Sequence, residues 1–94
     1  MAWGMISHRV HDYDKWKVVF EENAAVRKEF GCTGGYVFRD ADDPNKVTAL
    51  LEFESVERFR AFRQDPRLAD AMSRAGVDGP PDIRALEVAE RPEY

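Results

Sequence analysis

Hydrophobic positions recur with the period of an α-helix between Asp12 and about Phe30. At about 100° of rotation per residue, one face of this helix is aromatic and aliphatic, and the opposite face carries lysines and glutamates. Two polar residues, Asn23 and Arg27, fall at the centre of the apolar face. A buried amide or guanidinium needs hydrogen-bond partners, supplied by the protein or by a bound polar ligand. The pattern therefore predicts a pocket beside this helix.

Alternating hydrophobicity predicts strands at 3–10, 32–39, 46–53 and 82–90. The turn-forming stretch 40–45 joins the second and third strands into a hairpin. Two short helices are expected between the third and last strands, one beginning at Ser55 and one at Asp65.

This order of elements is the βαββαβ order of a ferredoxin-like α+β sandwich, in which the helices cover one face of an antiparallel sheet. We expect residues 1–94 to form a single domain.

The other face of the sheet is expected to be partly apolar. If residues 47, 49, 51 and 53 point towards the helices, Leu50 lies on the reverse face between Thr48 and Glu52. Hairpin pairing adds Val37, and the first strand adds Met5 and Trp3. A second copy of the chain, related by a two-fold axis, would cover this patch. The alternative is a solvated face with scattered apolar residues.

Composition narrows the range of partners. The net charge is −4 and the basic residues are dispersed among acidic ones, which argues against nucleic acid. No apolar run approaches the roughly 18 residues of a membrane span, and we expect a cytoplasmic protein. The single cysteine, Cys32, agrees with a reducing compartment. His8 and His11 fall on opposite sides of a strand, so no metal is predicted, and the glycines form no phosphate loop that would indicate a nucleotide cofactor.

Three polar residues are candidates for catalysis. His8 alternates with apolar neighbours on the first strand, so we expect it in the same layer as Asn23 and Arg27, where an imidazole can serve as acid or base. Arg27 could bind a carboxylate, enolate or phenolate, and Asn23 could donate to an oxyanion. In the alternative interpretation all three are structural: a satisfied buried histidine, an arginine in an ion pair and an asparagine bonded to backbone.

The second strand supplies a fourth candidate, Tyr36, which is expected to orient a ligand. Gly34 and Gly35 precede it and leave space for a flat molecule. Large apolar side chains from the helices would form the walls of the pocket, although side chains at this spacing can equally be plain core. The proposed wall residues are Trp16, Phe20, Phe59, Phe62 and Met72.

Several segments resemble the small dimeric α+β barrel proteins, and most closely the members labelled antibiotic-biosynthesis-monooxygenase-like or cyclase-like. The resemblance rests on 8–17, on Phe20 and Arg27, on the hairpin 39–45 before 50–53, and on 65–68 and 71–77, so it covers nearly the whole chain. It implies a homodimer with a small-molecule cavity in each subunit between sheet and helices. The superfamily includes cofactor-free quinone-forming oxygenases, haem-degrading enzymes, polyketide cyclases, lactone isomerases and members with no assigned activity.

The sequence departs from two of these branches. Haem degraders and quinone-forming oxygenases rely on polar residues and a tryptophan in the second helical region, where this chain has Phe59, Phe62 and Arg63. The cyclase-like branch can use a histidine on the first strand, and His8 matches that position. The resemblance thus implies a small aromatic or carbonyl-bearing ligand, with cofactor-free oxygenation, cyclisation or isomerisation as the chemistry. The competing interpretation is a non-catalytic binding or accessory protein.

Overall fold

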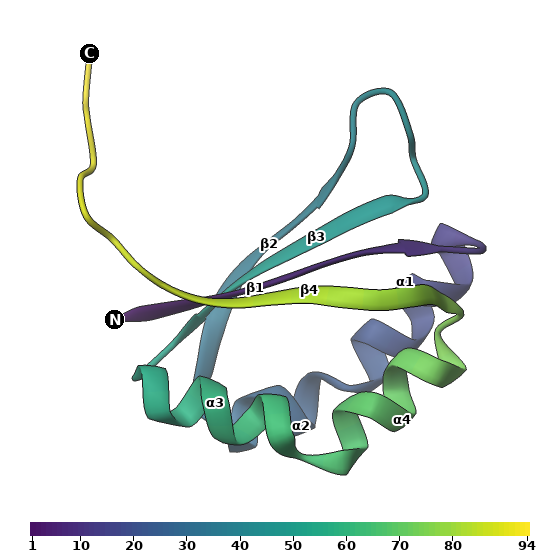
Figure 1. Ribbon diagram of the computed structural model, residues 1–94. Coiled ribbons are helices and arrows are strands. Elements are labelled where there is room, and N and C mark those ends of the chain that lie inside the picture. The colour runs from purple at the N-terminus through teal and green to yellow at the C-terminus, as the bar shows by residue number, and fades with distance from the viewer.

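The computed structural model describes residues 1–94 as a four-stranded sheet with four helices packed on one of its faces (Figure 1). In chain order the elements are β1 (Ala2–Val10), α1 (Tyr13–Glu22), α2 (Ala24–Glu29), β2 (Cys32–Arg39), β3 (Lys46–Phe53), α3 (Val56–Gln64), α4 (Pro66–Arg74) and β4 (Val77–Glu87). The strands lie in the order β2-β3-β1-β4, and each neighbouring pair is antiparallel. This is the ferredoxin-like α+β fold that the sequence predicts.

Side-chain caps begin three of the helices at the predicted residues. The Asp12 carboxylate accepts hydrogen bonds from backbone N–H groups in the first turn of α1, and Ser55 and Asp65 do the same for α3 and α4. Each cap satisfies an N–H group that the helix itself cannot pair. No helix is long and apolar enough to cross a membrane.

The helix predicted between Asp12 and about Phe30 is interrupted at Asn23, which corrects the expectation of one continuous helix. Asn23 has φ −84° and ψ 3°, so it ends α1 and precedes α2. At this break the carbonyl oxygen of Phe20 accepts a hydrogen bond of 2.7 Å from Nη1 of Arg27. Asparagine is a weak helix former, and the guanidinium satisfies a carbonyl group at the helix end.

A bulge in β2 reverses the faces of this strand relative to the prediction. The pairing of β2 with β3 shifts register between Cys32 and Gly34. Because side chains alternate along a strand, one extra residue moves every later side chain to the opposite face. Val37 therefore packs in the core and Tyr36 lies on the face away from the helices, the reverse of both expectations. Gly34 and Gly35 permit this path, since their φ angles of 143° and 148° are rarely adopted by other residues.

The last strand also departs from its predicted bounds, because it begins at Val77 and ends at Glu87 rather than spanning 82–90. The pairing with β1 shifts register on either side of His8, which places 79–81 in an irregular stretch. β4 has a single neighbour in the sheet, so the prolines in this stretch interrupt pairing only at an edge. His8 consequently lies at a point where the sheet is locally distorted.

Two clusters of buried side chains fill the space between the sheet and the helices. The larger cluster consists of Ile6, Ala49, Leu51, Phe53, Phe59, Phe62 and Leu68. The smaller cluster consists of Val10, Trp16, Val47 and Ala75. The inward positions of β3 are those that the sequence predicts.

The face of the sheet away from the helices carries an aromatic patch, here called the open-face patch. It consists of Trp3, Met5, Tyr36, Phe38 and Leu50, which are neighbours in the strand pairing or by ring stacking. The Trp3 and Tyr36 ring centroids are 6.5 Å apart, and Tyr36 is 61% exposed. The predicted apolar reverse face around Leu50 is thus present, with Tyr36 in the place expected for Val37.

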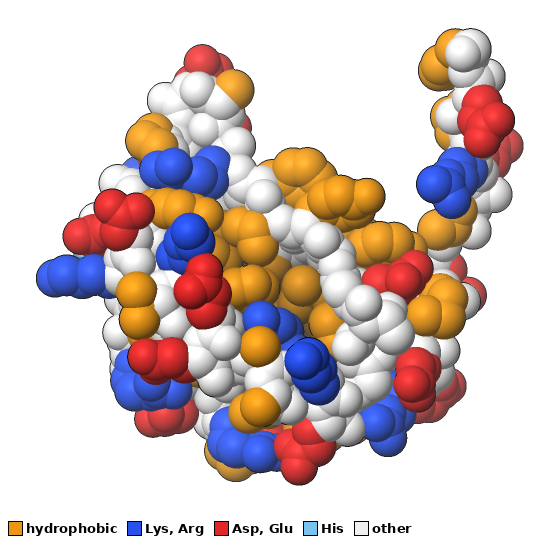
Figure 2. All heavy atoms as spheres, turned by 180° about the vertical axis from the view of Figure 1, so that it is seen from behind, with side chains coloured by type: hydrophobic (Ala, Val, Ile, Leu, Met, Phe, Trp, Pro, Cys, Tyr) orange, Lys and Arg blue, Asp and Glu red, His pale blue; other side chains and the backbone are white.

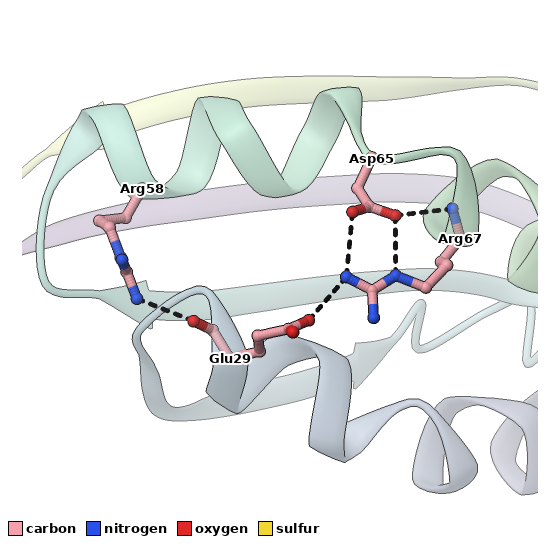
Figure 3. Close-up of polar contacts among 4 residues, drawn as sticks. All are labelled: Glu29, Arg58, Asp65 and Arg67. Atoms are coloured by element: carbon pink, nitrogen blue, oxygen red, sulfur yellow. Dashed lines mark hydrogen bonds and ion pairs between the residues drawn. The ribbon is translucent and has the colours of Figure 1, made fainter.

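Two arginines fasten the end of α2 to the helices that follow β3: Arg58 from the first turn of α3 and Arg67 from the first turn of α4 (Figure 3). Arg58 donates to the backbone carbonyls of Glu29 and Phe30 at 2.8 and 3.1 Å, and so caps the end of α2. Arg67 joins the Glu29 carboxylate, at 2.6 Å, to that of Asp65. These exposed contacts add little stability individually, but together they position the short helix that carries Arg27.

Candidate functional site

A cavity lies between the sheet and the helices at the point where α1 meets α2. The volume of this cavity is about 50 Å³, and eleven of its fourteen lining residues are hydrophobic. The three exceptions are His8 from β1, Asn23 from the α1–α2 junction and Arg27 from α2. The structure therefore brings together the three polar residues that the sequence singles out. Viewed from behind, the molecule has a hollow in which hydrophobic side chains border a basic one (Figure 2).

His8 is only 5% exposed, and its Nδ1 atom is buried without a hydrogen-bond partner. The ring of Trp16 meets the imidazole edge-on, with centroids 6.0 Å apart. Burial lowers the pKa of His8 below its ordinary value; the backbone of His8 itself partly opposes this shift, and the positive charge of Lys46 adds to it. His8 is thus neutral at neutral pH, which is the form that accepts a proton.

Arg27 is half-buried and has no carboxylate partner. Its guanidinium carbon lies 3.7 Å from the centroid of the Phe20 ring, and Nη1 donates to the Phe20 carbonyl oxygen. Burial lowers the pKa of Arg27, because the charged form is removed from water without a neutralising anion. The structural alternative of an ion pair therefore does not apply to this residue, and its other N–H groups are available to a ligand.

Asn23 is 8% exposed, and its side chain makes no hydrogen bond within the protein. It precedes α2 without capping it through the side chain, although asparagine is a favoured capping residue. The amide instead lines the cavity. An amide that no protein group engages is available to a polar group that enters the cavity.

These groups form a coherent set for acid–base chemistry. A neutral imidazole can remove a proton, and an amide and a guanidinium can donate hydrogen bonds to the oxygen on which negative charge develops. The apolar walls strengthen both effects by lowering the local dielectric constant. No group of three or more histidine, cysteine or acidic side chains is arranged to hold a metal ion.

Of the predicted wall residues, four line the cavity: Trp16, Phe20, Phe62 and Met72. Phe59 is instead fully buried in the core, where its ring fills the space beside Gly4. A Cβ atom on that glycine would stand 2.1 Å from the ring, so the absence of a side chain determines where Phe59 packs. Tyr36, predicted to orient the ligand, projects into the open-face patch because of the bulge in β2.

Small residues of α4 and of its C-cap complete the wall, and sequence reasoning missed them as site residues. Ala71 and Ala75, four positions apart, both line the cavity together with Leu68. Their spacing on the apolar face of α4 was the available signal, because alanine leaves room where a larger residue would fill the cavity.

Comparison with known proteins identifies the family. The sequence profile described as antibiotic biosynthesis monooxygenase matches residues 7–74. The chain belongs to the antibiotic biosynthesis monooxygenase family. A comparison with curated proteins found no match to this family member.

Solved structures share the fold of this antibiotic biosynthesis monooxygenase family member over nearly its full length. A Bordetella bronchiseptica protein assigned as an antibiotic biosynthesis monooxygenase is 16% identical, with a TM-score of 0.78 over 95% of this chain and 97% of that one. SnoaB, a cofactor-independent oxygenase from Streptomyces nogalater, is 14% identical, with a TM-score of 0.78 over 96% and 94%. A Deinococcus radiodurans protein with the same assignment as the first is 16% identical, with a TM-score of 0.70 over 100% and 98%. These likenesses show a shared ferredoxin-like α+β fold.

Proposed function

We propose that this family member is a homodimer of single-domain subunits and binds a small aromatic or carbonyl-bearing metabolite in its cavity. On that ligand it catalyses cofactor-free oxygenation or a proton transfer such as cyclisation or isomerisation. The observation that carries this proposal is the presence of three partnerless polar groups on one apolar cavity: the His8 Nδ1 atom, the Asn23 amide and the free N–H groups of Arg27. Purely structural residues would have found partners within the protein.

The chemistry follows from the assigned roles. His8 removes a proton from a methylene group that lies next to a carbonyl, and Asn23 and Arg27 stabilise the resulting enolate oxygen. Reaction of the enolate with dioxygen then replaces CH₂ by C=O and releases one molecule of water, which balances atoms and electrons without an added reductant. Return of the proton to another atom gives an isomer instead. The fold shared with SnoaB, a cofactor-independent oxygenase, supports the first outcome.

The open-face patch supports the dimer. Tyr36 and Phe38 are 61% and 51% exposed there, next to Trp3 and Leu50. Isolated apolar residues on a surface are ordinary, but a contiguous aromatic patch is typical of an interface. A second copy packed around a two-fold axis would cover the patch on both subunits at once. We expect an interface of about 1,600 Å² in total, the standard size for a stable complex.

A test uses 2-tetralone, in which a methylene group lies between an aromatic ring and a carbonyl. Without oxygen, the protein should accelerate exchange of the methylene hydrogens with deuterium oxide, measured by NMR. In air it should consume one dioxygen per product if it is an oxygenase. His8→Gln should slow both reactions about 100-fold or more, because general-base catalysis contributes roughly that much.

The matched control is His11→Gln, which removes the other histidine of the chain from an exposed site outside the cavity. It should leave both reactions unchanged. Neither exchange nor oxygen uptake above the protein-free rate, with the compound shown to bind, would contradict catalysis and favour a binding protein.

A further inference from the structure

A second hollow adjoins the cavity on the side of β2. Its volume, by the same measure, is about 160 Å³. Phe20, Arg27 and Leu51 line both spaces, so these three side chains form the partition between them. The second hollow is otherwise bordered by β2, including Cys32 and the glycines 34 and 35.

Neither space alone is a complete binding site for an aromatic ligand. A cavity of about 150 Å³ holds one benzene molecule, so the first space, at about 50 Å³, is too small for an aromatic ring while Arg27 stays in its present position. The second has room for a ring, but neither His8 nor Asn23 lines it. A flat ligand that places its reactive atom beside His8 must therefore extend through the partition into the second hollow.

The guanidinium of Arg27 is the movable part of this partition. It rests on the Phe20 ring and donates to the Phe20 carbonyl oxygen, and both contacts are to uncharged groups of one residue. No carboxylate holds it in place, and burial without an anion disfavours its charge. An arriving oxyanion would offer two parallel hydrogen bonds and a neutralising charge, which together exceed the present contacts.

The wall of the second hollow suits a planar group. Gly34 and Gly35 present backbone rather than side chains there, and a Cβ atom on Gly34 would meet nothing within 4 Å. Phe20 and Val37 offer apolar surface to the ring. An aromatic ring can therefore lie against this wall while its polar end reaches Arg27.

We propose that the ligand is a planar aromatic acid, bearing a carboxylate or ionised phenol, whose oxyanion draws Arg27 from Phe20 and joins the two spaces into one site. The ring then occupies the second hollow, and the substituent next to the oxyanion faces His8. Arg27 is in this arrangement a specificity-determining residue. The inference rests on the proposed function and adds the class of ligand to it.

The first experiment measures charge recognition by isothermal titration calorimetry with 2-naphthoate, the uncharged 2-naphthamide and acetate. Wild-type protein should bind 2-naphthoate at least tenfold more tightly than either of the others. Arg27→Met should remove the preference for the carboxylate over the carboxamide. Arg63→Met, which removes an exposed arginine of α3 that lines neither space, should preserve it.

The second experiment locates the ring through Cys32, the single cysteine of the chain, which lines only the second hollow. Saturating 2-naphthoate should slow alkylation of Cys32 by iodoacetamide at least fivefold, whereas the same concentration of acetate should not. Mass spectrometry of the intact protein follows the modification.

Three results would overturn the inference: equal binding of carboxylate and carboxamide, a carboxylate preference that survives Arg27→Met, or tight binding of 2-naphthoate without protection of Cys32. If 2-naphthamide binds and 2-naphthoate does not, the proposal of an acidic ligand is wrong, whereas the aromatic pocket of the proposed function still stands. If no aromatic compound binds, and 2-tetralone is also neither bound nor converted, both proposals fail.

Discussion

At the scale of single residues, the site is defined by polar groups that the protein leaves without partners. His8, Asn23 and Arg27 come from three different places in the fold and line one cavity, yet no side chain of the three bonds to another of them. The unpaired hydrogen-bonding groups of these side chains are therefore available to a ligand in the cavity. Two predictions separate this arrangement from a structural one.

The stability of the protein should depend on pH through His8. Burial lowers its pKa in the folded state, whereas the unfolded chain keeps the ordinary value of about 6.5. Between these two values the unfolded state binds more protons, so the free energy of unfolding rises with pH and falls as pH drops through about 6.5. Urea titrations from pH 5.5 to 7.5 should show this slope in the wild type and in His11→Gln. A slope that persists in His8→Gln would assign it to another group.

Substitution of Arg27 by methionine keeps the long apolar stem and removes a half-buried charge. Because no carboxylate is left unpaired, the free energy of unfolding should change by no more than about 1 kcal/mol, the scale of the lost hydrogen bond to Phe20. Loss of one partner from a buried ion pair would instead cost about 3 kcal/mol or more. Thermal and urea unfolding measure the difference. A large loss of stability would make Arg27 structural and remove the main support for Asn23 as a site residue.

At the scale of elements, two irregularities shape the site. The break at Asn23 turns one predicted helix into two, and the bulge in β2 determines which side chains of that strand meet the core. Both occur where the residue types tolerate them, asparagine in the helix and two glycines in the strand. Phe20 and Arg27, which belong to the partition between the two spaces, flank the break in the helix. The glycines of the bulge border the second hollow. The partition therefore lies between the two irregularities.

The glycine pair gives a direct test of the bulge. Gly34→Ala introduces only backbone strain, roughly 1–3 kcal/mol at such a φ angle, because its Cβ atom would meet nothing. Gly35→Ala introduces similar strain and places a Cβ atom 2.2 Å from the Leu50 carbonyl oxygen. The Gly35 variant should therefore be clearly the less stable of the two in urea unfolding. Equal losses would show that β2 takes another path.

At the scale of the whole molecule, the sheet has one face covered by helices and one face open (Figure 1). The open-face patch and the cavity lie on opposite sides of the same strands, so pairing of two subunits would stiffen the sheet on which His8 is held. Small chains also gain proportionately more from such burial, because a short chain buries a smaller share of its surface by folding alone.

The dimer is tested by Leu50→Lys, which places a charge in the middle of the open-face patch. Analytical ultracentrifugation should show a dimer for the wild type at micromolar concentration and a monomer for this variant, because an unpaired charge would be buried in the interface. Val18→Lys is the matched control, since Val18 is 54% exposed on α1 and receives the same change of chemistry. A wild-type protein that sediments as a monomer would contradict the proposed assembly.

The sequence by itself determined the order of elements and the inward face of each regular segment. The alternation in β3 and the caps Asp12, Ser55 and Asp65 are local signals, and the structure confirms them. The concentration of Asn23 and Arg27 on an apolar helix face was visible for the same reason, because helical periodicity depends only on neighbours in the chain.

Tertiary structure alone decided what local patterns do not encode. The bulge in β2 depends on pairing with β3, and it exchanged the faces of Tyr36 and Val37, because one added residue inverts every later position on a strand. Packing of Phe59 against Gly4 likewise required two segments to meet. A carboxylate partner for Arg27 could come from an acidic residue far away in the sequence, because sheet and helix packing make distant residues neighbours. Only the folded chain shows that no carboxylate reaches Arg27.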